Sequence, residues 1–364
     1  MTSKDLHKQP FSEETITKLD IFQKYLESWL PVAIQSPFIT EVNICDFFAG
    51  IGRDIKGTDG SPIRIIKTIK KFEDTILKQN LKIHILFNEY IPAKCQQLRD
   101  CIAKEQETLK NLDSNLSIEI FNLDFKELFI SKKTLLENHF NLVFLDQSGI
   151  KQITEEIFLD LTKFHRTDFM FFISSSAFKR FASHTSFQKY FPDIDLQELL
   201  MTKQNKMHRL IFQYYKSKIP NDSQIKLYPF TIKKGRNIYG LIFGSNHPLG
   251  VKKFLDIAWS TNELNGEASF DIDDDWESDQ MLLFGKRKLS KIEKFQIELE
   301  EFILSKKEVS NKEVYDFTLE NGHIIKNALP VFKKLEKKIS YTGHHNISYN
   351  KCYKSKEIKM FKVL

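Results

Sequence analysis

The chain has 364 residues, of which 41% are hydrophobic and 28% charged, with a formal net charge of +6. This is the composition of a globular protein with room for two domains. No window approaches the roughly 18 apolar residues of a membrane helix, and the N-terminus lacks a secretory signal, so we expect a cytoplasmic protein without membrane segments. The four cysteines have neither zinc-ligand nor disulfide spacing, and we expect no metal site.

The first 260 residues alternate between strand-like and helix-like patterns. Apolar side chains at helical spacing predict a leading helix over residues 14–30. Five apolar runs follow, each with a polar, helix-compatible stretch behind it, and two β-rich runs then flank a hairpin turn at residues 234–237. Such runs form parallel sheets covered on both faces, so we predict an α/β domain with a Rossmann-like sheet of class I methyltransferase type, completed by an antiparallel hairpin. The five runs start at Val42, Lys82, Ser117, Asn141 and Asp168.

Polar residues end four of these runs. The first leads into residues 46–52, D-F-F-A-G-I-G, whose glycines let backbone amides approach a ligand closely. Glu89 ends the second run, Asp124 ends the third, and Asp146 ends the fourth, followed by Gln147. Ligands of open α/β sheets bind at the carboxyl ends of the strands, so these residues predict one site for a nucleotide-type cofactor.

Each of these residues also has a structural interpretation. The glycines suit a turn that needs positive φ. Glu89 and Asp124 are as well placed to cap the following helices as to bind a ligand. Asp146 is a candidate cap for a helix near residues 154–163, although that helix is distant in sequence. The alternative role for Asp146 is a base or hydrogen-bond acceptor near a methylated nitrogen or oxygen.

Residues 46–52 resemble the D-x-F-x-G-x-G motif that holds the methionine part of S-adenosylmethionine. Several short segments together resemble the three-Cys-motif partner family: Lys18-Leu19-Asp20, residues 46–53, Gly60-Ser61-Pro62, Phe87-Asn88-Glu89, Asp146 with Gly149, and residues 241–250 with Trp259. The likeness spans residues 14–260. It implies a bacterial protein encoded beside a radical-enzyme-like partner with three cysteine motifs, often near mobile or defence genes.

The resemblance also implies roles for individual residues. Asp146 and Gln147 take the catalytic position, and the cofactor site consists of Asp46, Phe48, Gly50, Gly52, Glu89 and Asp124. The sequence differs from the family's motifs at two positions, which weakens the inference that the family's chemistry applies to it. Gln147 replaces the proline after the acid, and Ile51 replaces the proline between the glycines.

The basic residues concentrate at the C-terminus. Residues 286–364 carry 18 Lys and Arg against 10 Asp and Glu, a balance of +8. Three helical patterns, starting near Ser290, Ser310 and Ile324, and two β-like runs predict a winged helix. Its third helix carries lysines that could contact nucleic-acid phosphates, or simply form a solvated face. The predicted nucleic-acid-binding residues are Lys326, Lys333, Lys334 and Lys337.

These patterns predict a tail at residues 1–13, a methyltransferase-like domain at 14–262, an acidic linker at 263–287 and a winged helix at 288–364. A calcium loop at Asp271, Asp273 and Asp275 is the weaker interpretation of the linker, because the EF-hand glycine and glutamate are missing. Two functions fit: methylation of DNA or RNA with S-adenosylmethionine, working with a three-Cys-motif protein in anti-phage defence, or a non-catalytic scaffold that binds nucleic acid and that partner.

Overall fold

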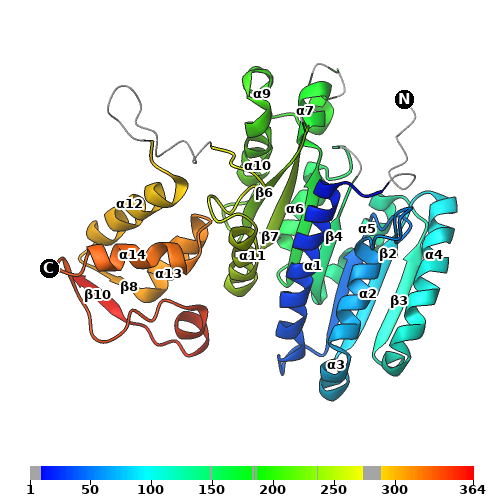
Figure 1. The fold of residues 1–364 in the computed structure, drawn as a ribbon, viewed down its shortest axis with the longest axis horizontal. Helices are drawn as coiled ribbons and strands as arrows, with labels where there is room; N and C mark the ends of the chain where they lie inside the picture. The colour runs from blue at the N-terminus through cyan, green and yellow to red at the C-terminus, as the bar shows by residue number, and fades with distance from the viewer. Residues whose placement is uncertain (1–9, 148–149, 183, 185–186, 236, 274–287) are drawn as a thin grey trace. The chain divides into compact units, whose positions relative to one another are not determined.

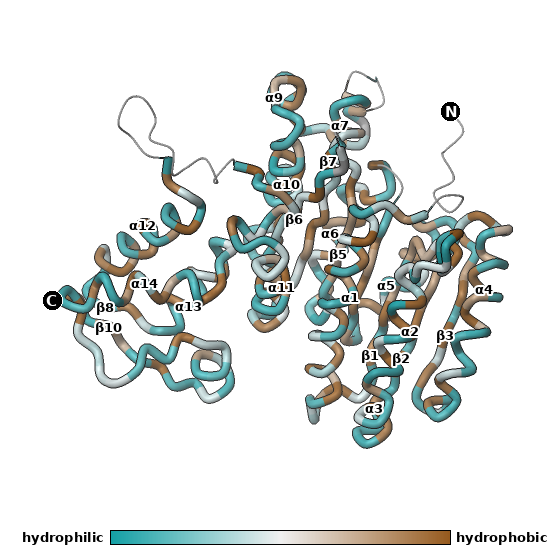
Figure 2. Tube along the Cα trace, in the orientation of Figure 1, coloured by the Kyte–Doolittle hydropathy of each residue, from teal (hydrophilic) through white to brown (hydrophobic). Residues whose placement is uncertain are grey.

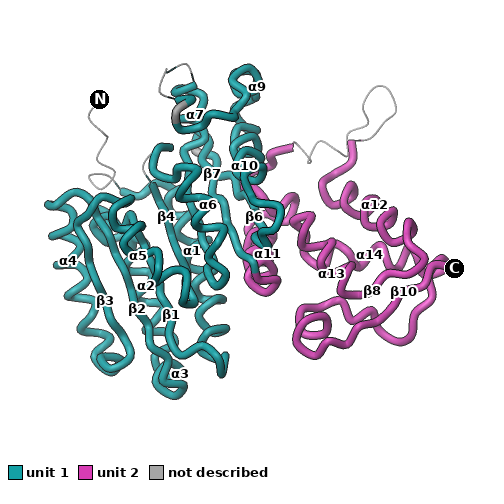
Figure 3. The backbone as a smooth tube through the Cα atoms, turned by 180° about the vertical axis from the view of Figure 1, so that it is seen from behind, with its two compact units in different colours: residues 1–246 teal, residues 247–364 magenta. Residues whose placement is uncertain are grey.

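The computed structural model describes residues 10–147, 150–182, 184, 187–235, 237–273 and 288–364. Gly149, Arg236, Asp275, most of the predicted tail and the second half of the predicted linker lie outside these ranges. The chain forms two compact units, residues 1–246 and 247–364 (Figure 3). The predicted boundary at residue 262 stays a prediction; contacts group residues 247–262 with the second unit.

Unit 1 contains a seven-stranded sheet of order β3-β2-β1-β4-β5-β7-β6 (Figure 1). Strands β1 to β5 are parallel, and β7 runs antiparallel to both β5 and β6. The predicted fold class, a Rossmann-like sheet of class I methyltransferase type with a terminal hairpin, is confirmed. The strands are β1 (Glu41–Asp46), β2 (Lys82–Asn88), β3 (Leu116–Phe121), β4 (Phe140–Leu145), β5 (Thr167–Ile173), β6 (Lys226–Lys234) and β7 (Asn237–Ser245).

One face of the sheet is covered by α1 (Glu13–Ile34), α2 (Ser61–Lys71) and α4 (Pro92–Gln106), with α3 (Glu73–Gln79) and a 3₁₀ turn at Glu107–Leu112 beside them. Helix α1 is the predicted leading helix, and it buries apolar side chains three and four residues apart, including Phe22 and Trp29. The Phe22 ring stacks on Phe144 of β4 with the ring centres 4.2 Å apart. This apolar stripe fixes α1 across the sheet.

The opposite face is covered by α5 (Phe125–Asn138), α6 (Glu155–Lys163) and α10 (Met207–Ser217). They share one cluster of buried aromatic side chains with the sheet, among them Phe129, Phe158 and Tyr215. Figure 2 shows the resulting alternation of hydrophobic and hydrophilic residues along the helices. Burial on both faces explains the continuous apolar strands.

Between β5 and α10 the chain forms short helices that the sequence analysis did not predict. They are α7 (Ser175–Phe181), α8 (Phe187–Tyr190), α9 (Leu196–Met201) and a 3₁₀ turn at Gln204–Lys206. The Ser176 hydroxyl accepts a 2.6 Å hydrogen bond from the Ile238 N–H, which ties α7 to the start of β7. These helices follow β5 and therefore start at the carboxyl edge of the sheet.

Unit 2 has the element order of a winged helix preceded by one further helix. Strands β8, β10 and β9 form an antiparallel sheet with β10 in the middle. Ser290 with Glu293 and Ser310 with Glu313 form two complete capping boxes, at the helix starts predicted near Ser290 and Ser310. The elements are α11 (Pro248–Thr261), α12 (Lys291–Leu304), β8 (Glu308–Ser310), α13 (Asn311–Glu320), α14 (Ile325–Lys334), β9 (Ile339–Ser340), a π-turn at Asn350–Lys354 and β10 (Met360–Val363).

Helix α11 is bound to the winged helix by buried contacts. The Trp259 indole N–H donates a 2.9 Å hydrogen bond to the Gly322 carbonyl, and the ring lies 5.1 Å from that of His323. His323 in turn stacks on Phe295 with the ring centres 4.0 Å apart. Burial lowers the pKa of His323 to about 2, so this imidazole stays neutral and serves as a packing group. In the described part of the chain, no helix is long and apolar enough to cross a membrane.

Candidate cofactor site and nucleic-acid interface

Asp46 ends β1 as a fully buried carboxyl group. Its Oδ1 atom accepts a 3.1 Å hydrogen bond from the Phe48 N–H. Its Oδ2 atom is buried and has no hydrogen bond of normal geometry within the described ranges. Burial raises the pKa of Asp46 to about 7, against the lowering effects of the Ser61 hydroxyl and the Phe48 N–H. At the end of β1 there is therefore a buried carboxyl that has the Ser61 hydroxyl beside it and one oxygen without a hydrogen bond of normal geometry.

The predicted glycine turn follows directly. Gly50 and Gly52 have φ of 64° and 90°, a region that side chains disfavour. A Cβ on Gly52 would come within 2.9 Å of the Cys101 sulfur. The Gly60 N–H donates a 2.7 Å hydrogen bond to the Gly52 carbonyl, so two turns cross closely here. The turn interpretation of these glycines is confirmed, and their ligand role stays a prediction.

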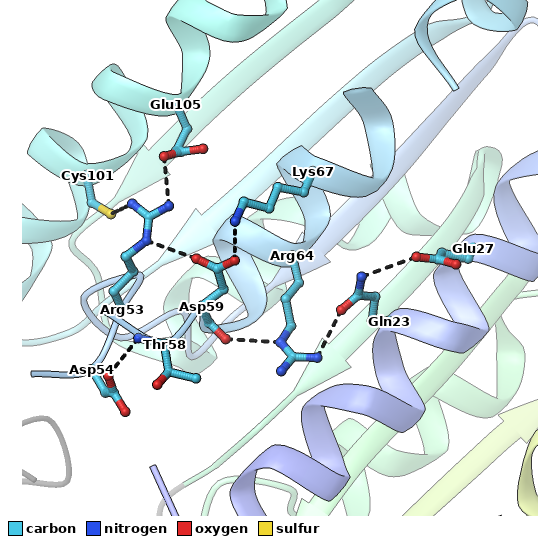
Figure 4. Close-up of polar contacts among 10 residues, drawn as sticks. All are labelled: Gln23, Glu27, Arg53, Asp54, Thr58, Asp59, Arg64, Lys67, Cys101 and Glu105. Carbon is cyan, nitrogen blue, oxygen red and sulfur yellow. Dashed lines mark hydrogen bonds and ion pairs between the residues drawn. The ribbon is translucent and has the colours of Figure 1, made fainter. Parts of the chain in front are cut away.

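An ion-pair network that the sequence analysis missed holds the second turn (Figure 4). Arg53 bonds Asp59 across the turn at 2.9 Å and Glu105 of α4 at 2.8 Å. Lys67 of α2 reaches the other oxygen of Asp59, and Arg64 donates to the Asp59 carbonyl at 3.0 Å. The turn is therefore tied to two helices, which keeps Gly60 and the start of α2 in place. Only the fold brings these charges together, because Arg53 and Glu105 are 52 residues apart.

Glu89 and Asp124 both make local hydrogen bonds, but only Asp124 caps a helix. Glu89 accepts from the Ile91 N–H at 2.8 Å, and Asp124 caps α5 by accepting from the Lys126 N–H at 2.9 Å. Each bond uses one carboxylate oxygen. The capping interpretation is therefore confirmed for Asp124 and wrong for Glu89, because the N-cap residue of α4 is Ile91 and no side chain caps that helix. A ligand role for either residue stays a prediction.

Asn88 connects three of the strand ends. Its side-chain amide donates to the carbonyls of Phe47 and Leu123 and accepts from the Leu123 N–H. The adjoining loops expose Tyr90, Ile91 and Leu123, with 67%, 43% and 42% of their surface accessible. Three apolar side chains thus stand in solvent beside Glu89 and Asp124, which suits a flat organic group better than an ion.

Asp146, after the end of β4, pairs with a residue from a distant part of the chain. Its carboxylate bonds the ammonium of Lys18 in α1, and that ammonium lies 4.5 Å from the centre of the Phe172 ring of β5. Asp146 does not cap α6: the Thr154 hydroxyl does so, by accepting from the Ile157 N–H. The capping interpretation of Asp146 is therefore wrong, because a residue adjacent to the helix fills that role.

Gln147 is buried with 3% of its surface exposed. Its carbonyl oxygen accepts a 2.9 Å hydrogen bond from the Gln152 N–H, while its side-chain nitrogen has no partner within the described ranges. Phe48 packs on Phe125 of α5 with the ring centres 4.9 Å apart. The Gln147 side-chain NH2 group is thus not used by any described residue, and Phe48 has a packing role in addition to the predicted one.

The four predicted lysines of unit 2 do not behave alike. Lys334 bonds Glu300 of α12, so its charge is engaged within the unit. Lys326, Lys333 and Lys337 are exposed, and no described residue pairs with them. Lys326 and Lys333 are seven residues apart in α14, which places them on one side of that helix, and Lys337 lies in the turn that follows it.

One family model and two solved structures are similar to parts of this chain. Residues 271–343 match the family described as the GMT-like wHTH domain, where wHTH denotes a winged helix-turn-helix. Trm1 from Pyrococcus horikoshii, solved in complex with S-adenosyl-L-methionine, is 11% identical with a TM-score of 0.38 over 68% of this chain. This chain spans only 59% of Trm1. A proposed O-methyltransferase from Klebsiella pneumoniae is 8% identical with a TM-score of 0.31, over 65% of this chain and 90% of that one.

No curated protein matches the chain. At these identities the similarities concern the fold only, and the fold class rests on the order and directions of the strands. Among the described residues, no group of three or more His, Cys, Asp or Glu side chains could hold a metal ion.

Proposed function

We propose that this chain methylates a nucleic acid with S-adenosylmethionine as the methyl donor. The observation that carries the proposal is the buried Asp46 carboxyl beside the glycine turn at the end of β1, whose Oδ2 atom has no hydrogen bond of normal geometry to any described residue. An unsatisfied carboxylate oxygen in a protein interior is costly unless a ligand completes it. In a sheet of this order, ligands bind at this edge.

The residues at this edge suit the two halves of the cofactor, which supplies a methyl group activated on a sulfonium ion. Asp46 would accept a hydrogen bond from the methionine ammonium, above the turn formed by Phe48, Gly50 and Gly52. The remaining oxygens of Glu89 and Asp124 would accept from the ribose hydroxyls and the adenine amino group. The exposed Tyr90, Ile91 and Leu123 would contact the apolar faces of the purine.

Asp146 and Gln147 lie on the acceptor side of this arrangement. The Asp146 carboxylate would accept a hydrogen bond from the nitrogen or oxygen to be methylated, and the free amide donor of Gln147 would help to orient that group. Holding the reacting atoms in line is the main contribution such a site makes.

Calorimetry with S-adenosylmethionine and S-adenosylhomocysteine tests the cofactor site. We expect binding that Gly50→Asp and Glu89→Ala abolish in folded variants. Glu137→Ala, which removes an exposed glutamate of α5, is the matched control and should bind as the parent does. No binding of either ligand to the parent at millimolar concentration would rule out the enzyme.

The winged helix would dock the nucleic acid through Lys326, Lys333 and Lys337. Lysines contact phosphates without reading bases, so affinity should fall steeply with salt. Replacing all three by alanine should reduce the slope of log affinity against log salt by roughly 2 to 3 on duplex DNA. The control replaces three other exposed lysines of unit 2, and an equal loss there would argue against the α14 face. These are Lys294, Lys307 and Lys362.

The resemblance to the three-Cys-motif partner family supports a further part of the proposal: the chain works with a three-Cys-motif protein, in bacterial defence. None of the matched families or structures bears that name. Co-purification of the two proteins from cells that express both tests the partnership, and separate elution at low salt would contradict it.

A non-catalytic scaffold is the second candidate, and one observation favours it. The Asp146 carboxylate is already engaged by Lys18, as an acid retained only for structure would be. Parent protein that binds nucleic acid but transfers no methyl group to any cellular DNA or RNA would support the scaffold.

A further inference from the structure

Lys18 is an unusual residue for the position that it occupies. It lies on α1, before the first strand, and only 7% of its surface is exposed. Its ammonium bonds Asp146, which follows β4, and sits over the Phe172 ring of β5. A lysine so well buried is rare unless it is paired. Here α1 brings a positive charge to the carboxyl edge of the sheet, where Asp46 and Asp146 both lie.

Docking of α1 does not explain this lysine. Three aromatic rings of α1 already anchor the helix on the sheet. The ring centres are 4.2 Å apart for Phe22 and Phe144, 4.9 Å for Tyr25 and Phe243, and 4.8 Å for Trp29 and Phe140. Removing two charges from water costs several kcal/mol, and an apolar pair of similar volume often stabilises as well. The pair therefore calls for a role beyond holding the helix.

The charges around Asp46 indicate that role. The charged and titratable groups that act on this carboxyl are Lys18 from α1 and Asp146 after β4, and the Ser61 hydroxyl of α2 lies beside it. Lys18 favours the ionised form of Asp46 and Asp146 opposes it. With both acids ionised the cluster has one net negative charge, a match for a ligand with one net positive charge.

We propose that Lys18 is a positioning residue of the methyl-transfer site: its ammonium, which lies over the Phe172 ring, holds the Asp146 carboxylate in place and, through its charge, favours the ionised form of Asp46 that would bind the cofactor. The role of Lys18 toward the cofactor rests on the proposed function. The electrostatic effect of Lys18 on Asp46 does not, and it can be measured in the protein without ligand. Helix α1 is thereby part of the site.

The test measures the titration of Asp46 in the full-length protein without ligand, by NMR of ¹³C-labelled aspartate carboxyls assigned with Asp46→Asn. In Lys18→Met the midpoint should rise, because a nearby opposite charge is lost. Lys18→Arg should restore it. Lys24→Met, which removes an exposed lysine of the same helix, should leave it unchanged.

Asp146→Asn gives an independent measurement, which also serves if Lys18→Met does not fold. Removing this like charge should lower the Asp46 midpoint, the opposite direction to Lys18→Met. A pair that only docks α1 would loosen in both variants and shift the midpoint in the same direction. That result, or no shift in Lys18→Met, would overturn the proposal.

The second readout is binding of S-adenosylmethionine by calorimetry across pH. Affinity in Lys18→Met should be lost at about pH 7, where Asp46 is protonated, and return toward about pH 9, whereas the parent changes less over that interval. A pH profile identical to that of the parent would overturn the role of Lys18 toward the cofactor. Opposite NMR shifts without binding to any variant would uphold the electrostatic effect of Lys18 and refute the proposed function instead.

Discussion

Asp46→Asn should make the protein more stable at neutral and alkaline pH. Burial raises the pKa of Asp46 from its ordinary value of 3.8 to about 7 in the folded protein. The folded state thus holds this proton more tightly than the unfolded chain. The resulting stabilisation is fully present below the unfolded pKa and is lost as the pH rises through about 7.

The size of the effect follows from the shift. A change of roughly three pKa units corresponds to ~4 kcal/mol, an upper bound for a buried carboxyl that can relax. Asparagine keeps the acceptor for the Phe48 N–H and has no charge to desolvate. The free energy of unfolding of the variant, relative to that of the parent, should therefore increase between about pH 4 and about pH 8, by as much as ~4 kcal/mol.

Calorimetric melts of parent and variant across this pH range measure the difference. The two proteins must be compared because burial also raises the pKa of Asp168, to about 6. Asp168 therefore destabilises parent and variant equally as the pH rises, and its effect cancels in the difference between their stabilities. Asp74→Asn, at an exposed position of α3, should show no pH-dependent difference. An Asp46→Asn difference that is equally flat would refute the reasoning. The same variant should lose S-adenosylmethionine binding, so stability and function would change in opposite directions.

Three further predictions concern other parts of the molecule. Asp146→Asn should slow methyl transfer to mixed cellular DNA and RNA by roughly 10²-fold with little change in cofactor affinity, and a fully active variant would remove Asp146 from the catalytic residues. Arg53→Met should weaken cofactor binding by loosening the glycine turn, without changing nucleic-acid affinity; unchanged binding in a folded variant would make the network purely structural. A chain ending at Asn246 should melt cooperatively and bind no nucleic acid. A chain ending at residue 285 keeps α11 but loses the partners of Trp259, so it should bind a hydrophobic dye.

The sequence alone determined the main strands and helices and indicated a parallel sheet that ends in an antiparallel hairpin. A short continuous apolar run such as β5, which is buried along its whole length, indicates a strand of a sheet covered on both faces. The capping boxes at Ser290 and Ser310 predicted where two helices begin, because a cap is made by residues three apart. The same locality explains why Asp124 could be recognised as a cap candidate.

Only the tertiary structure decided what the strand-end residues contact. Lys18 and Asp146 are 128 residues apart, and nothing in the local pattern of either indicates that they form a pair. Arg53 and Glu105 meet because α4 packs beside the turn. The short helices after β5 were also missed, since their apolar side chains pack on a surface that exists only once α10 and β7 are in place. Periodicity and caps arise within a few residues, whereas ion pairs and buried charges depend on which distant elements the hydrophobic core brings together.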